Sequence, residues 1–204
     1  MIDSVLNSDR AGAGDADRIV DPNETGVAVY GLSRTGLALS VLCTRVVDSV
    51  TAADTDGTRV AAIQHGTSPV SDPLLSESLV EATDDGELRA TTELPEAAAE
   101  STIHLVAVTT GLREDDVPDL SVLRATLRDI ATEISPGDVV VLTTPVPPGT
   151  TEGVVESTLV EESSCSASEL GLAVCALPTD RSLRSIRTGD LVVAGTDSRS
   201  RAAA

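Results

Sequence analysis

Short apolar runs recur along most of the chain, and stretches with apolar residues at every third or fourth position follow them. The runs are continuous and not alternating, which is typical of parallel strands buried on both faces. They predict seven strands, at residues 27–30, 50–53, 88–91, 103–108, 139–142, 172–177 and 191–194.

The stretches between these runs have the spacing of helices that bury one face. Helices are predicted at residues 37–46, 56–64, 73–83, 93–100 and 149–162. Asp72-Pro73 supplies an N-cap and a proline at the first helical position, and Pro118-Asp119 caps a further helix whose apolar stripe runs from Leu123 to Ile134. The alternation predicts an α/β fold, a doubly wound Rossmann-like parallel sheet with helices on both faces.

The first 25 residues differ from the rest. They mix small, acidic and turn-forming residues and show no apolar periodicity. Such a composition predicts a disordered acidic leader at residues 1–25. We therefore expect one Rossmann-like dinucleotide-binding domain at residues 26–204.

Charge narrows the range of partners. The sequence has 14 basic residues, all of them Arg, against 33 acidic ones, which gives a net charge of −19. Nucleic acids and anionic membrane surfaces need clustered cations, so neither is expected as a partner. Like charges repel within a compact state unless salt screens them, which predicts a salt-adapted protein. We find neither a signal-peptide pattern nor an apolar run of ~18 residues, and we expect a cytoplasmic protein.

Cysteine and histidine are scarce. The candidates are Cys43, Cys165, Cys175, His65 and His104, and their spacing fits no zinc motif, so no metal site is predicted. Cysteines in apolar surroundings are commonly small core residues, and a disulfide between Cys165 and Cys175 is the alternative.

The turn after the first predicted strand reads Gly-Leu-Ser-Arg-Thr-Gly, from Gly31 to Gly36. It lies where a strand–turn–helix unit carries the dinucleotide fingerprint G-x-G-x-x-G. Ser33 replaces the second glycine, which lets backbone press against a pyrophosphate, and its Cβ predicts weakened binding. The start of the helix still offers unpaired N–H groups to a phosphate, with Arg34 and Thr35 beside them.

An acidic residue ends the second strand. Asp54 lies where a carboxylate accepts hydrogen bonds from an adenosine ribose and disfavours a 2′-phosphate, which favours NAD over NADP. Two alternatives remain at this point. The turn uses small residues for packing only, or Asp54 is a helix-capping or solvated carboxylate.

A longer series of segments resembles one family. The segments are residues 31–40, 54–75, 86–92, 107–121 and 146–152, the last reading Val-Pro-Pro-Gly-Thr-Thr-Glu. In this order they resemble the NAD-binding domain of the UDP-glucose/GDP-mannose dehydrogenase family, which includes UDP-N-acetylmannosamine dehydrogenases.

The resemblance implies NAD-dependent oxidation of the sugar 6-hydroxyl of a UDP- or GDP-sugar, through an aldehyde to a carboxylate. It places Thr110 and Thr144 beside the cofactor and Arg59 at its adenosine end. Asp180 stands where the family has a glutamate that serves thioester hydrolysis. Pro145 replaces a family threonine that is expected to position a catalytic water.

The resemblance also implies a missing part, because the family's C-terminal sugar-nucleotide domain supplies a nucleophilic cysteine and a lysine. The sequence contains no Lys. We therefore expect a truncated chain that is inactive alone. It is either half of an enzyme, with a separately encoded C-terminal domain as its partner, or a fragment of a longer reading frame. The alternative is a non-catalytic nucleotide-binding or regulatory relic of the family. A hydroxyacid-type dehydrogenase is a third interpretation, but it too needs a lysine and a helical second domain.

Overall fold

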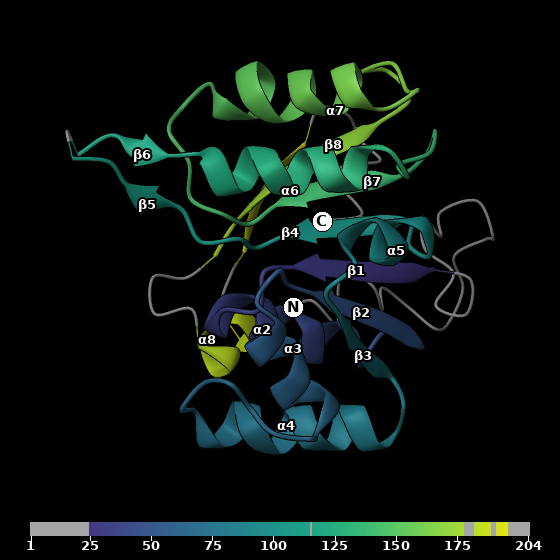
Figure 1. Ribbon diagram of the computed structural model, residues 1–204, viewed down its shortest axis with the longest axis vertical. Helices are drawn as coiled ribbons and strands as arrows, with labels where there is room; N and C mark the ends of the chain where they lie inside the picture. The colour runs from purple at the N-terminus through teal and green to yellow at the C-terminus, as the bar shows by residue number, and fades with distance from the viewer. Residues whose placement is uncertain (1–24, 115, 178–181, 189–190, 196–204) are drawn as a thin grey trace.

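The computed structural model describes residues 25–114, 116–177, 182–188 and 191–195, and it shows a twisted sheet between helices (Figure 1). The strands of this sheet are β1 (Gly26–Tyr30), β2 (Ser49–Ala53), β3 (Leu88–Thr91), β4 (Ile103–Val106), β7 (Val139–Leu142), β8 (Gly171–Ala176) and β9 (Val192–Gly195). The predicted strands are confirmed, with ends that differ by two residues at most. The predicted leader lies almost wholly outside the described residues.

The helices follow the predicted order. They are α2 (Arg34–Cys43), α3 (Gly57–Gln64), α4 (Pro73–Asp84), α5 (Leu94–Ala99), α6 (Ser121–Ala131), the π-helix η1 (Thr151–Glu156), α7 (Ser157–Glu162) and α8 (Leu183–Thr188). Two features were not predicted: α8, and the division of the 149–162 helix into η1 and α7. Helix α4 begins as predicted, with Pro73 in its first turn and the Asp72 carboxylate accepting the Leu75 N–H.

The strand order is β3-β2-β1-β4-β7-β8-β9, and every neighbouring pair is parallel except β8 and β9. The expectation of a wholly parallel sheet is therefore wrong for the last strand. Strand β9 instead pairs antiparallel with β8, with Gly195 opposite Ala173 and Val192 opposite Ala176.

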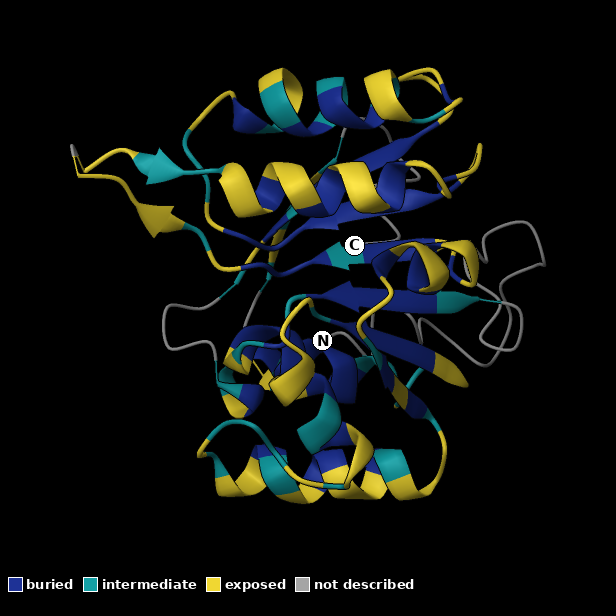
Figure 2. Ribbon diagram, in the orientation of Figure 1, coloured by how far each residue is buried: buried dark blue, intermediate teal, exposed yellow. Residues whose placement is uncertain are grey.

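Helices cover both faces of the sheet, as predicted. On one face, Val29 and Ala52 of the sheet pack with α2, α4 and α8. On the other, Ala28 and Val140 pack with α5, α6 and α7. Figure 2 shows the strands buried between these two layers. Alternate residues of the central strands thus enter separate apolar clusters, and the inner residues of β7 and β8 on the first face form a third cluster.

One buried polar group interrupts the second core. The hydroxyl of Tyr30, the chain's one tyrosine, lies 3.0 Å from His104 Nδ1, and His104 Nε2 lies 3.5 Å from Asp138 Oδ2. Both rings are fully buried. Burial, reinforced by the Asp138 carboxylate, raises the pKa of Tyr30 far above its usual range. The hydroxyl is therefore protonated and able to donate to His104.

A two-stranded hairpin, β5 (Gly111–Leu112) and β6 (Pro118–Asp119), extends from the body after β4 (Figure 2). It corrects the expectation that Pro118-Asp119 is the cap of α6, because the N-cap position belongs to Leu120. The Asp119 carboxylate nevertheless accepts the Ser121 N–H at 2.9 Å. This hydrogen bond lowers the pKa of Asp119.

Candidate functional site

The turn between β1 and α2 lies at the carboxyl edge of the sheet, next to the end of β4. Helices leave β1 and β4 toward opposite faces, which makes this edge the switch point where α/β sheets bind ligands. The Gly31 N–H donates to the Ala53 carbonyl, and the Ala107 N–H donates to the Tyr30 carbonyl, both at 2.8 Å. The neighbouring strands thus hold the turn on both sides.

Both retained glycines are required by the geometry of this turn. Gly31 has φ +98°, and a Cβ there would lie 2.9 Å from backbone atoms of Ala107 and Val108. A Cβ on Gly36 would lie 1.7 Å from the Gly31 carbonyl oxygen. Strand and helix therefore approach each other as closely as the dinucleotide fingerprint requires.

The start of α2 presents donors for an anion. The first intrahelical bond runs from the Leu37 N–H to the Ser33 carbonyl, so the N–H groups of Arg34, Thr35 and Gly36 have no acceptor within the helix. Ser33 occupies the N-cap position, and its hydroxyl makes no capping hydrogen bond. The Ser33 side chain thus brings both a Cβ and a hydroxyl to the place where the fingerprint has a bare backbone.

Asp54 is joined directly to the turn. One carboxylate oxygen accepts the Leu32 N–H at 2.6 Å, and the other accepts the Asp56 N–H at 2.9 Å. A carboxylate has about four lone-pair sites, so capacity remains for ribose hydroxyls. The structure therefore brings Asp54 and the glycine turn together, in the relation that dinucleotide binding needs.

Two arginines near the turn are paired with carboxylates. Arg59 lies 3.5 Å from Asp54 and 3.3 Å from Asp56. Arg34 lies 3.3 Å from Asp72. The sequence prediction omitted Asp56, although the Asp-x-Asp spacing after β2 was a usable signal, and it treated Asp72 only as a helix cap.

The two predicted threonines lie in the segments that follow β4 and β7. Thr144 is buried, and its hydroxyl is 2.8 Å from the Val108 carbonyl and 3.2 Å from the Val106 carbonyl. Thr110 is half-buried, two residues beyond Val108. The contact with Val108, whose backbone adjoins Gly31, places Thr144 on the same edge of the sheet as the turn.

Asp180, the predicted catalytic residue, lies outside the described residues. The three cysteines are free thiols, and Cys165 and Cys175 belong to different apolar clusters, so the alternative disulfide is wrong. Burial raises the pKa of the Cys43 thiol to about 12 and also raises that of Cys175. Both thiols are thus poor nucleophiles at neutral pH. The described part of the chain contains no group of three or more side chains suited to a metal ion.

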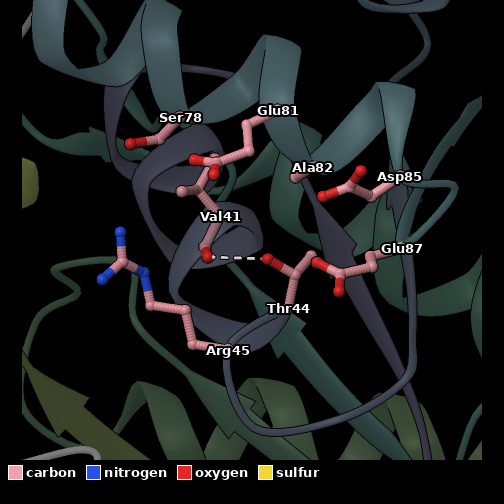
Figure 3. A pocket seen from close by; sticks show the side chains of 8 residues that line it. All are labelled: Val41, Thr44, Arg45, Ser78, Glu81, Ala82, Asp85 and Glu87. Atoms are coloured by element: carbon pink, nitrogen blue, oxygen red, sulfur yellow. Dashed lines mark hydrogen bonds between the residues drawn. The ribbon is translucent and has the colours of Figure 1, made fainter.

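A separate pocket of about 490 Å³ lies between the far ends of α2 and α4 (Figure 3). Its charged residues are Glu81, Asp85, Glu87 and Arg45, so carboxylates outnumber cations by three to one. Since α2 runs from the turn toward the start of β2, this pocket lies at the opposite edge of the sheet. Its negative charge disfavours a diphosphate.

The sequence was also compared with known proteins. Residues 25–203 match the model of the "UDP-glucose/GDP-mannose dehydrogenase family, NAD binding domain". The chain belongs to this family. NAD is thereby confirmed as the cofactor of this type of domain, and the Rossmann-like fold is confirmed with it.

Curated relatives are nucleotide-sugar dehydrogenases. An NDP-N-acetyl-D-galactosaminuronic acid dehydrogenase of Ralstonia nicotianae is 34% identical over 136 residues, which cover 67% of this chain and 31% of the relative. A UDP-N-acetyl-D-mannosamine dehydrogenase of Pyrococcus horikoshii is 29% identical over 126 residues, or 62% and 30% of the two chains. The matches thus span about a third of each relative's length.

Solved structures show the same relationship. An NDP-N-acetyl-D-galactosaminuronic acid dehydrogenase from Methanosarcina mazei superposes with a TM-score of 0.81 at 27% identity, over 87% of this chain and 40% of the other. A UDP-glucose dehydrogenase from Pyrobaculum islandicum gives a TM-score of 0.80 at 25% identity, over 93% of this chain and 44% of the other.

Among the described helices, none has the length and apolar character needed to cross a membrane.

Proposed function

We propose that this chain binds NAD at the β1–α2 turn and provides the cofactor half of an enzyme that oxidises the 6-hydroxyl of a UDP- or GDP-sugar to a carboxylate. The observation that carries the proposal is the turn itself. Gly31 and Gly36 give close approach, the first N–H groups of α2 have no acceptor within the helix, and Asp54 is bonded to the turn. When bound, NAD would accept a hydride from the sugar carbon.

Different residues near the turn would contact different parts of NAD. In the proposal, the N–H groups of Arg34, Thr35 and Gly36 and the Ser33 hydroxyl hold the diphosphate. Asp54 accepts hydrogen bonds from the adenosine ribose. Its fixed negative charge also repels a 2′-phosphate, which favours NAD over NADP.

Three further assignments rest on the family resemblance. Arg59 would lie along the adenosine, and Thr110 and Thr144 would line the nicotinamide end. Thr144 donates to main-chain carbonyls in this structure, so its remaining capacity toward a ligand is as an acceptor. Asp180 would assist the hydrolysis step. A cytoplasmic location is proposed separately, on the acidic, salt-adapted composition.

We further propose that turnover needs residues that the family's C-terminal domain supplies, on this chain or on a separate one. The sequence contains no Lys, although the family chemistry uses one, and two of its cysteines have raised pKa values. Ser33 at the second glycine and Pro145 at the family threonine favour a second candidate, a non-catalytic nucleotide-binding module. Production of NADH on mixing the isolated chain with UDP- and GDP-sugars would contradict both proposals about turnover.

Calorimetric titration of NAD in molar KCl tests the binding proposal. We expect weak binding by the wild type and tighter binding by Ser33→Gly, because the variant removes the Cβ from the diphosphate position. NADP is the matched ligand and is expected to bind more weakly than NAD. Absence of heat with both the wild type and the variant would remove the assignment.

A further inference from the structure

Arg34 joins two segments that are far apart in the sequence. It is the first residue of α2, and its guanidinium lies 3.3 Å from Asp72 Oδ2 and donates to the Ser71 carbonyl at 3.4 Å. Both acceptors lie at the start of α4. The guanidinium of Arg34, beside the proposed diphosphate position, is therefore already paired with the carboxylate of Asp72.

This ion pair is well suited to exchange. The Arg34 side chain is 47% exposed and that of Asp72 is 16% exposed, so the guanidinium is open to solvent and to a ligand while the carboxylate is partly covered. Ion pairs with one solvent-exposed partner contribute only modestly to stability. A guanidinium binds a phosphate through two parallel hydrogen bonds, which is a stronger interaction than a single contact with a carboxylate. A diphosphate can thus compete with Asp72 for Arg34.

The β1–α2 turn offers a diphosphate less backbone contact than a turn with a second glycine would, and a nearby cation can compensate for this loss. The Leu32 N–H is used by Asp54, and the Ser33 Cβ keeps a ligand away from the backbone that a second glycine would expose. A charged group that reaches out from the turn supplies attraction that the backbone has lost.

We propose that Arg34 is a diphosphate ligand and that its ion pair with Asp72 competes with the diphosphate for it. In the free chain Arg34 is bound to Asp72 and Ser71, and a dinucleotide draws it onto the diphosphate. The charge of Asp72 therefore regulates the affinity by opposing binding. This inference rests on the proposed NAD site and adds a competing residue from α4 to it.

The test is a double-mutant cycle with ADP-ribose, measured by calorimetry at a KCl concentration that keeps the chain folded. Arg34→Ala is expected to weaken binding about tenfold, as for loss of a charged hydrogen-bond pair. Asp72→Asn is expected to tighten binding by roughly threefold, because Asn keeps the acceptor for the Leu75 N–H and removes only the charge. In the Arg34→Ala background, Asp72→Asn should have no effect.

Controls separate this inference from the proposed function. Arg45→Ala changes the same residue type just beyond the other end of α2 and should leave ADP-ribose binding unchanged. Adenosine, which has no phosphate, should bind all variants alike. If the wild type does not bind ADP-ribose, the proposed function and this inference both fail. If it binds and Asp72→Asn has no effect, or has the same effect without Arg34, only this inference fails.

Discussion

The two ends of α2 have opposite chemistry. Its first turn carries free N–H groups, the Ser33 hydroxyl and the Arg34 guanidinium, whereas Glu81 and Glu87 line the pocket at its other end (Figure 3). The helix dipole adds partial positive charge at the first end and partial negative charge at the second. The comparison shows that the location of a pocket does not by itself locate an anion site, because the unpaired N–H groups of the helix start and the close backbone approach favour the turn.

The largest expected effect comes from removing the close approach. Gly36→Ala should destabilise the fold by about 3 kcal/mol or more, because its Cβ would overlap the Gly31 carbonyl and force the helix from the sheet. Urea unfolding followed by circular dichroism measures this. Gly153→Ala is the matched control, since a Cβ there meets open space. Equal stability of Gly36→Ala and wild type would show that the turn is not tightly packed.

Asp54 provides the next test of the turn. Asp54→Ala should weaken NAD binding about tenfold or more, because the ribose loses its acceptor and the Leu32 N–H loses its partner. Glu87→Gln, at the other end of α2, serves as the control and should leave the affinity unchanged. A titration in which both variants bind like the wild type would contradict the assignment of Asp54.

Tyr30 directly precedes Gly31 and supplies a pH-dependent probe of this end. Burial raises the pKa of Tyr30 in the folded chain, so folding favours the protonated hydroxyl. The stability that this provides is complete below the pKa of Tyr30 in the unfolded chain, near 10, and is lost as the pH rises above that pKa. Between pH 9 and 11 the wild type should lose roughly 1 kcal/mol more stability than Tyr30→Phe. Since the sequence has one tyrosine and no tryptophan, phenolate absorbance reports Tyr30 alone. Phenolate formation at pH 10 in the folded chain would contradict the burial.

Much of the fold was predictable because periodicity reports burial. Continuous apolar runs located every strand of the main sheet, and Asp72-Pro73 located the start of α4. The hairpin β5–β6 escaped prediction because each of its strands has two residues, too few for any period. The antiparallel direction of β9 was also missed, because an apolar run predicts that a strand exists and not which way it runs.

The site was predictable where residue type and position coincide. Gly31 and Gly36 were predicted from the motif after β1 and Asp54 from its place at the end of β2, and the structure brings the three residues together. Contacts between distant segments were not visible in the same way. The pairing of Arg34 with Asp72 joins residues 38 apart, and no local pattern encodes it.

The smallest effect concerns the acidic end of α2. Glu81→Gln combined with Glu87→Gln should stabilise the fold by up to about 1 kcal/mol at low salt, because it removes like charges near a helix C-terminus. In molar KCl the difference should vanish through screening. Thermal unfolding over a series of KCl concentrations tests this together with the proposed salt adaptation. If the gain in stability is equal at all salt concentrations, it comes from packing and not from charge.

The most direct measurement is a titration of the ¹⁵N-labelled chain with ADP-ribose, followed by amide NMR shifts. The account predicts that the largest shifts occur at the N–H groups of Arg34, Thr35 and Gly36, and that Arg45, beyond the other end of α2, does not respond. Shifts centred on Arg45 and Glu87, or no shifts up to the highest ADP-ribose concentration that the sample tolerates, would contradict binding at the turn.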